Sequence, residues 1–179
     1  MQIRTVVFGG MFLFALSAYA QYYPARAPGS NDRRDEQDFV TLAAERVTGQ
    51  IAHANLALQH GVDEPTRQVA QRIVIQDSQV LSDLKRIAAE QHFTLPGQLS
   101  AQGQEEQNVL SRLKGDRFDA DYTEMSWVRL TFDVPRFEAE EKEASIPALS
   151  AFAAKYVPMM RGQTARLSEV APRERGKAE

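Results

Sequence analysis

The chain has 179 residues, of which 43% are hydrophobic and 25% are charged, a composition typical of a soluble protein with one sizeable core. Its formal net charge of −3 is small, so electrostatics favour neither nucleic acid nor an anionic membrane surface as a partner. The chain has no cysteine, so the apolar core must hold the fold without disulfides.

The first 20 residues have the pattern of a secretory signal peptide. Arg4 provides a positive charge, an apolar stretch runs from Val6 to Leu16, and Ala18-Tyr19-Ala20 matches a cleavage site. This stretch is shorter than the roughly 20 residues needed to span a bilayer, and no later segment is long and uncharged enough. We therefore expect cleavage after Ala20, export to the periplasm, and no membrane span in the cleaved chain.

Residues 21–36 combine Pro24, Pro28 and Gly29 with mixed charges and no apolar period, which predicts a disordered leader. From Asp38 onward, apolar residues recur at steps of three or four and predict a long amphipathic helix that ends at Gly61. The residues expected on its buried face are Phe39, Ala43, Val47, Ile51, Ala54 and Leu58.

Asp63 and Pro65 are typical of a helix start and predict a second long helix, which Leu95-Pro96-Gly97 should stop. One apolar strip comprises Val69, Ile73, Val80, Leu84 and Ile87, and a second comprises Val74 and Leu81. Two strips predict helical neighbours on two sides, as in a bundle. In the connection that follows, a short helix is expected over Glu105–Lys114, with Val109, Leu110 and Leu113 on its apolar side.

A third long helix is predicted after Gly115, which should end the preceding element, with Asp116 or Asp119 as its cap. Its two apolar seams comprise Phe118, Tyr122, Met125, Val128 and Phe132, and Trp127, Leu130, Val134 and Phe137. Pro135 lies inside this pattern and predicts either a kink or a restart capped by Asp133.

The last helix should begin with Ser145 as cap and Pro147 in its first turn, bend at Pro158, and end near Val170. Its buried positions are Leu149, Phe152, Tyr156, Met160, Gln163, Leu167 and Val170. We therefore expect one all-α domain over residues 37–171, with four long helices and one short helix, followed by a disordered tail at 172–179.

Four motifs span the predicted helices: Phe39-Val40 with Ala43-Ala44, Gln76-Asp77-Ser78 with Leu84, Leu110-x-x-Leu113-x-Gly115-x-x-Phe118-Asp119-x-x-Tyr122, and Val157-Pro158-x-Met160. In these motifs the chain resembles a bacterial family of exported proteins, domain of unknown function 4142. The resemblance implies a ferritin-like four-helix bundle with a short crossover helix. It also implies histidines at three positions that here are Ser78, Leu130 and Gln163, so any role of those histidines does not transfer to this chain.

The helical spacing predicts that Ser78, Leu130 and Gln163 point inward, with the two polar side chains hydrogen-bonded. The acids expected inward are Glu45, Asp77, Glu124 and Asp133. A di-iron bundle needs Glu-x-x-His on two helices, and the chain contains no such motif. We therefore expect no cofactor, and Asp77 and Glu124 are only weak metal-site candidates.

The remaining metal-binding residue types favour structural roles. His53 and His60 are two helical turns apart, about 10.5 Å of rise, so they cannot share one metal ion and are expected at the surface or its boundary, as is His92. The methionines Met125, Met159 and Met160 lie in the apolar seams and are expected to fill the core.

Two functions remain open from the sequence. The first is a non-enzymatic exported module that binds an unknown protein or a small molecule on its surface or between its helices. The alternative is an enzyme, or a metal-handling or redox protein, whose core site uses Asp77, Glu124, Gln163 and nearby Met or Tyr groups.

Overall fold

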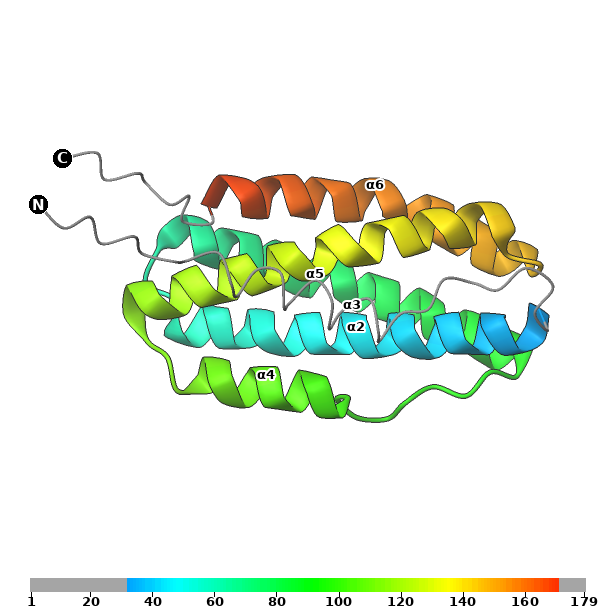
Figure 1. Ribbon diagram of the computed structural model, residues 1–179, viewed down its shortest axis with the longest axis horizontal. Helices are drawn as coiled ribbons and strands as arrows, with labels where there is room; N and C mark the ends of the chain where they lie inside the picture. Colours follow the sequence, from blue (N-terminus) through cyan, green and yellow to red (C-terminus); the bar gives the residue numbers. More distant parts are fainter. Residues whose placement is uncertain (1–31, 171–179) are drawn as a thin grey trace, which may run out of the picture. The chain divides into compact units, whose positions relative to one another are not determined.

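The computed structural model describes residues 32–170, and these residues form five helices and no strand. In chain order the helices are α2 (Asp32–His60), α3 (Glu64–Gln91), α4 (Ala101–Ser111), α5 (Gly115–Glu143) and α6 (Pro147–Val170) (Figure 1). The all-α prediction is thus confirmed for this part of the chain. The predicted signal peptide, most of the predicted leader and the predicted tail lie outside the described residues. None of the five helices is long and apolar enough to cross a membrane.

The long helices pack as two hairpins. α2 packs most extensively on α3, and α5 on α6, while the contacts of α2 with α5 and of α3 with α6 are less extensive. We call α2–α3 the first hairpin and α5–α6 the second hairpin. The short helix α4 lies beside α2 (Figure 1). All five helices contribute to one apolar core, for example through Val40, Ile73, Leu110, Phe118 and Leu149.

Most apolar positions predicted to face the core are buried or partly buried, and two are exposed. Leu58 is 39% exposed, because the buried side of α2 passes through Ala54 and Ala57 at its end. Val109 is 48% exposed, because its neighbour Leu110, about 100° further around α4, takes the inward position. Both predictions were therefore wrong in detail while the helices themselves are present.

Where residues close in sequence set a helix end, the prediction agrees with the structure, as the start of α3 shows. Asp63 caps α3 by accepting the backbone N–H of Thr66 at 3.2 Å, and Pro65 lies in the first turn. The helix was predicted to continue to Leu95-Pro96-Gly97, but α3 ends earlier, at Gln91. His92 there adopts the left-handed conformation, with φ 57°, and its N–H bonds to carbonyls of the last turn.

Two helices begin earlier than predicted. α2 begins at Asp32, six residues before the predicted Asp38, so residues 32–36 are helical instead of belonging to the leader. These additional helical residues place the buried Glu36 against the loop before α6. α4 begins at Ala101 instead of Glu105, because Ser100 provides a cap by accepting the N–H of Gly103 at 3.1 Å.

The predicted cap of α5 is wrong. The residue before this helix is Lys114, which makes no side-chain cap bond, and neither Asp116 nor Asp119 takes that role. Gly115 has φ +61°, a left-handed conformation that glycine adopts readily, and it opens α5. The backbone conformation of Gly115, without a side-chain cap, therefore sets the start of α5.

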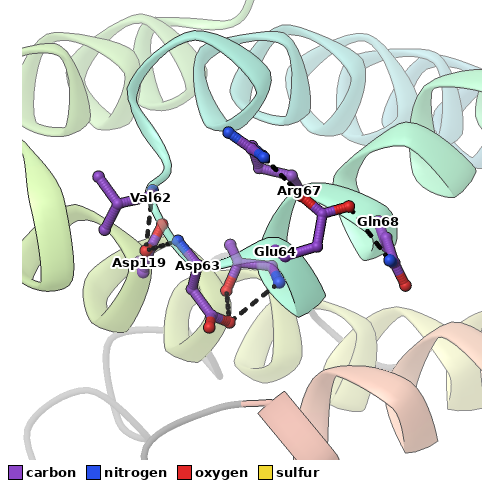
Figure 2. Close-up of polar contacts among 7 residues, drawn as sticks. Val62, Asp63, Glu64, Arg67, Gln68 and Asp119 are labelled. Carbon is purple, nitrogen blue, oxygen red and sulfur yellow. Dashed lines mark hydrogen bonds and ion pairs between the residues drawn. The ribbon is translucent and has the colours of Figure 1, made fainter.

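Asp119 caps a different part of the chain, the turn between α2 and α3. Its Oδ2 accepts the backbone N–H groups of Val62 at 3.1 Å and Asp63 at 2.8 Å (Figure 2). Gly61 makes this approach possible, because a Cβ there would lie 2.6 Å from the Ala57 carbonyl oxygen and 2.8 Å from Asp119 Oδ1. The glycine predicted as a helix end is thus required for space, since its φ is not in the left-handed region.

Helices α5 and α6 differ from expectation at two further residues, Asp133 and Ser145. α5 runs through Pro135 without a break, so the predicted restart capped by Asp133 is wrong, and Asp133 is buried. Ser145 donates its hydroxyl to Glu36 Oε1 at 2.9 Å, so it connects α6's entry to α2. Pro158 lies inside α6 and is exposed, and the bend expected there stays a prediction.

Candidate functional site

Polar side chains are buried between the two hairpins. Each is at most 7% exposed, and they come from α2, α3, α5 and α6. We call this set the polar layer: Arg46, Gln50, His53, Asp77, Arg129, Asp133 and Gln163. Buried polar and charged groups lower stability unless they find partners, so their pairing defines what the layer can do.

Asp77 on α3 and Gln163 on α6 connect the hairpins at the middle of the layer. Gln163 Nε2 donates to Asp77 Oδ1 at 2.8 Å and to Gln76 Oε1 at 3.2 Å. Burial raises the pKa of Asp77 to about 7, the Gln163 hydrogen bond opposes this rise, and the charge of Asp133 adds to it. Asp77 therefore gains or loses its proton near neutral pH.

Asp133 has a cationic neighbour. Its Oδ1 lies 3.6 Å from Nε of Arg46, and both side chains are almost fully buried. Burial raises the pKa of Asp133, while the positive charges of Arg46, Arg129 and Arg136 oppose that rise. The charge of this carboxylate is thus balanced within the layer, unlike the charge that Asp77 acquires when it ionises.

Arg129 joins the layer to α4. Its Nη2 forms an ion pair with Glu106 Oε2 at 3.0 Å, and its Nη1 donates to His53 Nδ1 at 3.2 Å. Burial and the Arg129 charge lower the pKa of His53 to about 4, so the ring is neutral at pH 7 and its Nε2–H donates to the Gly103 carbonyl at 3.2 Å. Gly49 leaves room for this arginine, because a Cβ there would lie 3.3 Å from Nη1.

A cavity of about 10 Å³ lies within the polar layer. Its polar lining consists of Arg46, Gln50, Asp77, Asp133 and Gln163. The other lining residues are Val47, Val80, Leu130, Phe137, Met159 and Met160. Gln50 Nε2 and Gln163 Oε1 have no hydrogen-bond partner among the described residues. The cavity has room for about one water-sized species, and polar atoms that lack partners border it.

The structure brings together two of the three positions where the family resemblance implied histidines. Leu130 and Gln163 both line the cavity, together with the candidate Asp77. Ser78 does not join them, because it is exposed and donates to the Val74 carbonyl at 2.6 Å, so the prediction that it points inward was wrong. Glu124 is exposed on α5, which removes it from the core-site candidates.

One of the three histidines differs from prediction. His53 was expected at the surface or its boundary but is 1% exposed, because Arg129 and α4 enclose it. His60 is partly buried, with its ring 5.5 Å from that of Phe118 in an edge arrangement, and His92 is exposed. Only His53 of the three belongs to the polar layer.

Sequence reasoning missed both arginines of the layer. Arg46 lies three residues after Ala43 on the apolar side of α2, and Arg129 lies seven after Tyr122 and four before Asp133 on α5. Charged residues that fall in step with an apolar stripe are the signal that could have identified them.

The chemistry of the layer is that of carboxyl, amide and guanidinium groups and one neutral imidazole. Among residues 32–170, no three His, Cys, Asp or Glu side chains gather in a way that could hold a metal ion. Burial, with the nearby charge of Asp77 as a further cause, raises the pKa of Tyr122, so its phenol stays neutral at physiological pH. The arrangement can therefore hold a proton on Asp77 and offer hydrogen bonds to a small polar species.

Comparison with known proteins adds one match. The family model described as "Domain of unknown function (DUF4142)" matches residues 23–170, a range that includes all five helices and the whole polar layer. A search of the curated proteins gave no match, and neither did a search of the solved structures. The functional argument therefore depends on the residues of the polar layer.

Proposed function

The chain belongs to the DUF4142 family, and we propose that it is an exported, non-enzymatic binding module that takes up a small polar species between its two hairpins. The polar layer is the observation that supports this function. Uncompensated polar groups in a core lower stability, yet five polar side chains of this layer line one cavity. Two of the amides there, Gln50 and Gln163, still have an atom free to bond.

The proposal includes the architecture and the location. We assign the five helices to a ferritin-like four-helix bundle in which α4 is the crossover helix, in line with the family resemblance. We assign residues 1–20 to a signal peptide and the cleaved protein to the periplasm. Sequencing the N-terminus of the exported protein tests this: a start at Gln21 supports it, and retention of Met1 in an uncleaved cytoplasmic chain contradicts it.

A thermal-shift screen of the purified, exported chain tests the binding function. Small polar solutes and inorganic ions are added at constant ionic strength, and a species that binds the folded state raises Tm as its concentration increases. The increase should disappear in Asp77→Asn, which changes the cavity lining. It should persist in the control Asp83→Asn, because Asp83 lies on the same helix but bonds to Lys155 and Tyr156 outside the cavity. If no species raises Tm in the unmodified chain, the binding function is wrong.

One observation favours the alternative of a metal-handling or redox protein with a core site. The carboxylates Asp77 and Asp133 line the same cavity as Met159 and Met160, which supplies oxygen and thioether donors together. Elemental analysis after metal supplementation tests it. Stoichiometric metal that is lost in Asp77→Ala and kept in the exposed control Glu124→Ala would favour this alternative, and no bound metal in the supplemented chain would count against it.

A further inference from the structure

The short helix α4 buries little apolar surface of its own. Within residues 101–111, Leu110 is the one buried apolar side chain, and Gly103 is the other buried residue. An element with few buried apolar contacts opens at a lower free energy than the bundle unfolds. The attachment of α4 therefore depends strongly on its polar contacts.

Those polar contacts place α4 over one end of the polar layer. The helix lies beside α2 (Figure 1), where its Gly103 carbonyl is 3.2 Å from His53 Nε2. Its Glu106 Oε2 is 3.0 Å from Nη2 of Arg129 on α5. His53 lies one helical turn after Gln50, which lines the cavity. Moving α4 away would thus expose the part of the layer next to the cavity.

The chain on both sides of α4 can absorb such a movement. Gly97 lies in the connection from α3, and Gly115 follows the connection to α5 with φ +61°. A Cβ at either glycine would meet none of the described atoms within 4 Å. Hinges of moving elements are short loop segments of this kind. α4 can therefore move while the two hairpins stay packed.

His53 holds this contact only while its ring is neutral. Its Nδ1 accepts a hydrogen bond from Arg129 Nη1 at 3.2 Å. A second proton would occupy Nδ1, which removes the acceptor and sets a buried positive charge against that of Arg129. Burial is the larger cause that lowers the pKa of His53 to about 4, the Arg129 charge is the next, and the Gly103 bond opposes both. A charged ring is therefore relieved when α4 moves and water reaches it.

We propose that α4 is a lid on the polar layer and that it opens when His53 takes up a proton. The closed-state pKa of about 4 lies below the ordinary 6.5, so the closed lid loses stability as pH falls below 6.5, and the loss is complete below pH 4. This inference rests on the proposed function for what the lid admits, a small polar species, while the opening itself needs no ligand.

Charged groups of the layer on the other helices respond differently to acid. Asp77 on α3, bonded to the neutral Gln163 of α6, takes up its proton near pH 7, which favours the folded bundle. Acidification to pH 5 should thus loosen α4 without loosening the hairpins. The charged groups that surround His53 are Glu106 from α4, Arg129 and Asp133 from α5, and Arg46 from α2.

Amide hydrogen exchange of the purified, exported chain at pH 7.5 and pH 5 tests the inference. After correction for the intrinsic pH dependence of exchange, protection in residues 101–111 should fall by up to roughly 30-fold at pH 5. Protection of the buried part of α3 should stay the same or rise. The fall in α4 should disappear in His53→Gln, whose side chain takes up no proton. It should remain in the control His92→Asn, because His92 is exposed and asparagine also adopts its left-handed backbone.

Labelling of an introduced cysteine tests whether the opening reaches the layer, since the chain has no cysteine of its own. Gln50→Cys places a thiol at the cavity, and Glu105→Cys places one at an exposed position of α4 as the control. A dipyridyl disulfide reacts with both thiols in acid. The rate for Gln50→Cys, divided by that for Glu105→Cys at the same pH, should rise as the protection of α4 falls.

Four results would each overturn the lid: constant protection of α4 between pH 7.5 and pH 5, a fall that α3 shares, a fall that persists in His53→Gln, or an unchanged labelling ratio. The binding function fails separately. If α4 opens as expected but no solute raises Tm, the lid stands and the binding function is wrong. If a solute raises Tm while the protection of α4 does not change with pH, the binding function stands and the lid is wrong.

Discussion

At the scale of single residues, Asp77 couples the stability of the fold to pH. Its folded-state pKa of about 7 lies above the ordinary value of 3.8, because burial disfavours the charged form. The folded state therefore binds a proton more tightly than the unfolded state does. This stabilisation is complete below pH 3.8 and is lost as pH rises toward 7, after which the deficit stays constant.

Asp77→Asn should remove this pH dependence, since the amide keeps the shape of the carboxyl group and cannot ionise. We expect the variant to have a Tm about 5 °C or more above the wild type at pH 8, with the difference vanishing near pH 4. Calorimetric unfolding from pH 4 to pH 8 measures it. The surface variant Asp83→Asn serves as control and should show no such gain at pH 8; an Asp77→Asn curve parallel to the wild type would contradict the buried, raised pKa.

Gly61 is the second residue whose role is local. Gly61→Ala should lower the free energy of unfolding by about 1–3 kcal/mol, because the added Cβ meets the Ala57 carbonyl and Asp119, the carboxylate that caps the α2–α3 turn. Gly162→Ala is the matched control, since a Cβ there has open space inside α6 and should stabilise by up to about 1 kcal/mol. Urea unfolding compares them, and equal effects of the two changes would show that the turn can yield.

At the scale of elements, α4 is attached to α2 and α5 by a few identifiable contacts. Leu110 buries its side chain, and two polar contacts reach into the polar layer: Glu106 to Arg129 and the Gly103 carbonyl to His53. The ion pair is enclosed, because the Arg129 side chain is 3% exposed and that of Glu106 17%. Removing one partner of a buried pair costs more than the pair itself contributes, since the other charge then lacks compensation.

Glu106→Gln should therefore loosen α4 selectively. We expect faster amide hydrogen exchange in residues 101–111 and a loss of about 1–3 kcal/mol in the free energy of unfolding. The neighbouring Glu105→Gln, at an exposed position of the same helix, should change stability by no more than about 0.5 kcal/mol. If exchange in α4 is the same in both variants, the ion pair does not hold this helix.

The elements also show how far the sequence predicts the structure. The helices followed from apolar periodicity, and the α3 start followed from Asp63, because those signals lie within a few residues of what they determine. Asp119 was assigned to the wrong helix end, and the bond from Ser145 to Glu36 was not foreseen, because the partners Val62 and Glu36 are distant in sequence. A local pattern identifies a capping residue type, but it does not say which backbone the side chain reaches.

The candidate site was predictable only in part, for the same reason. Asp77 and Gln163 were singled out, yet their hydrogen bond joins residues 86 positions apart and appears only when the hairpins meet. His53 was placed near the surface because one apolar stripe says nothing about α4, which covers it. Arg129 falls in step with an apolar stripe, but its partners Glu106 and His53 lie on other helices, so the sequence does not show what it pairs with.

At the scale of the whole molecule, polar contacts join the two hairpins at several levels, and their carboxylates respond to pH in opposite directions. Asp77 stabilises the folded state when it is protonated. Glu36, fully buried, accepts the N–H and the hydroxyl of Ser145 and the N–H of Ile146, all on one oxygen at 2.6, 2.9 and 3.3 Å. Burial alone would raise the pKa of Glu36, but these bonds, with one involving Glu140, outweigh burial and lower it. Glu36 therefore stabilises the folded state when it is ionised.

Glu36→Gln tests this opposite sign, because the amide fills the same space without the charge that three donors share. A lowered folded-state pKa gives stability that is present above the ordinary value of 4.5 and lost as pH falls through the folded-state pKa. We expect the variant to be about 1–2 kcal/mol less stable than the wild type at pH 7. That gap should narrow as pH falls below 4.5, where the Asp77→Asn gap is also small. The exposed Asp38→Asn on the same helix is the control, and denaturant unfolding at pH 7 and pH 3.5 measures all three chains. A Glu36→Gln deficit that is equal at both pH values would mean that Glu36 joins the hairpins by shape alone and that only Asp77 links their contact to protons.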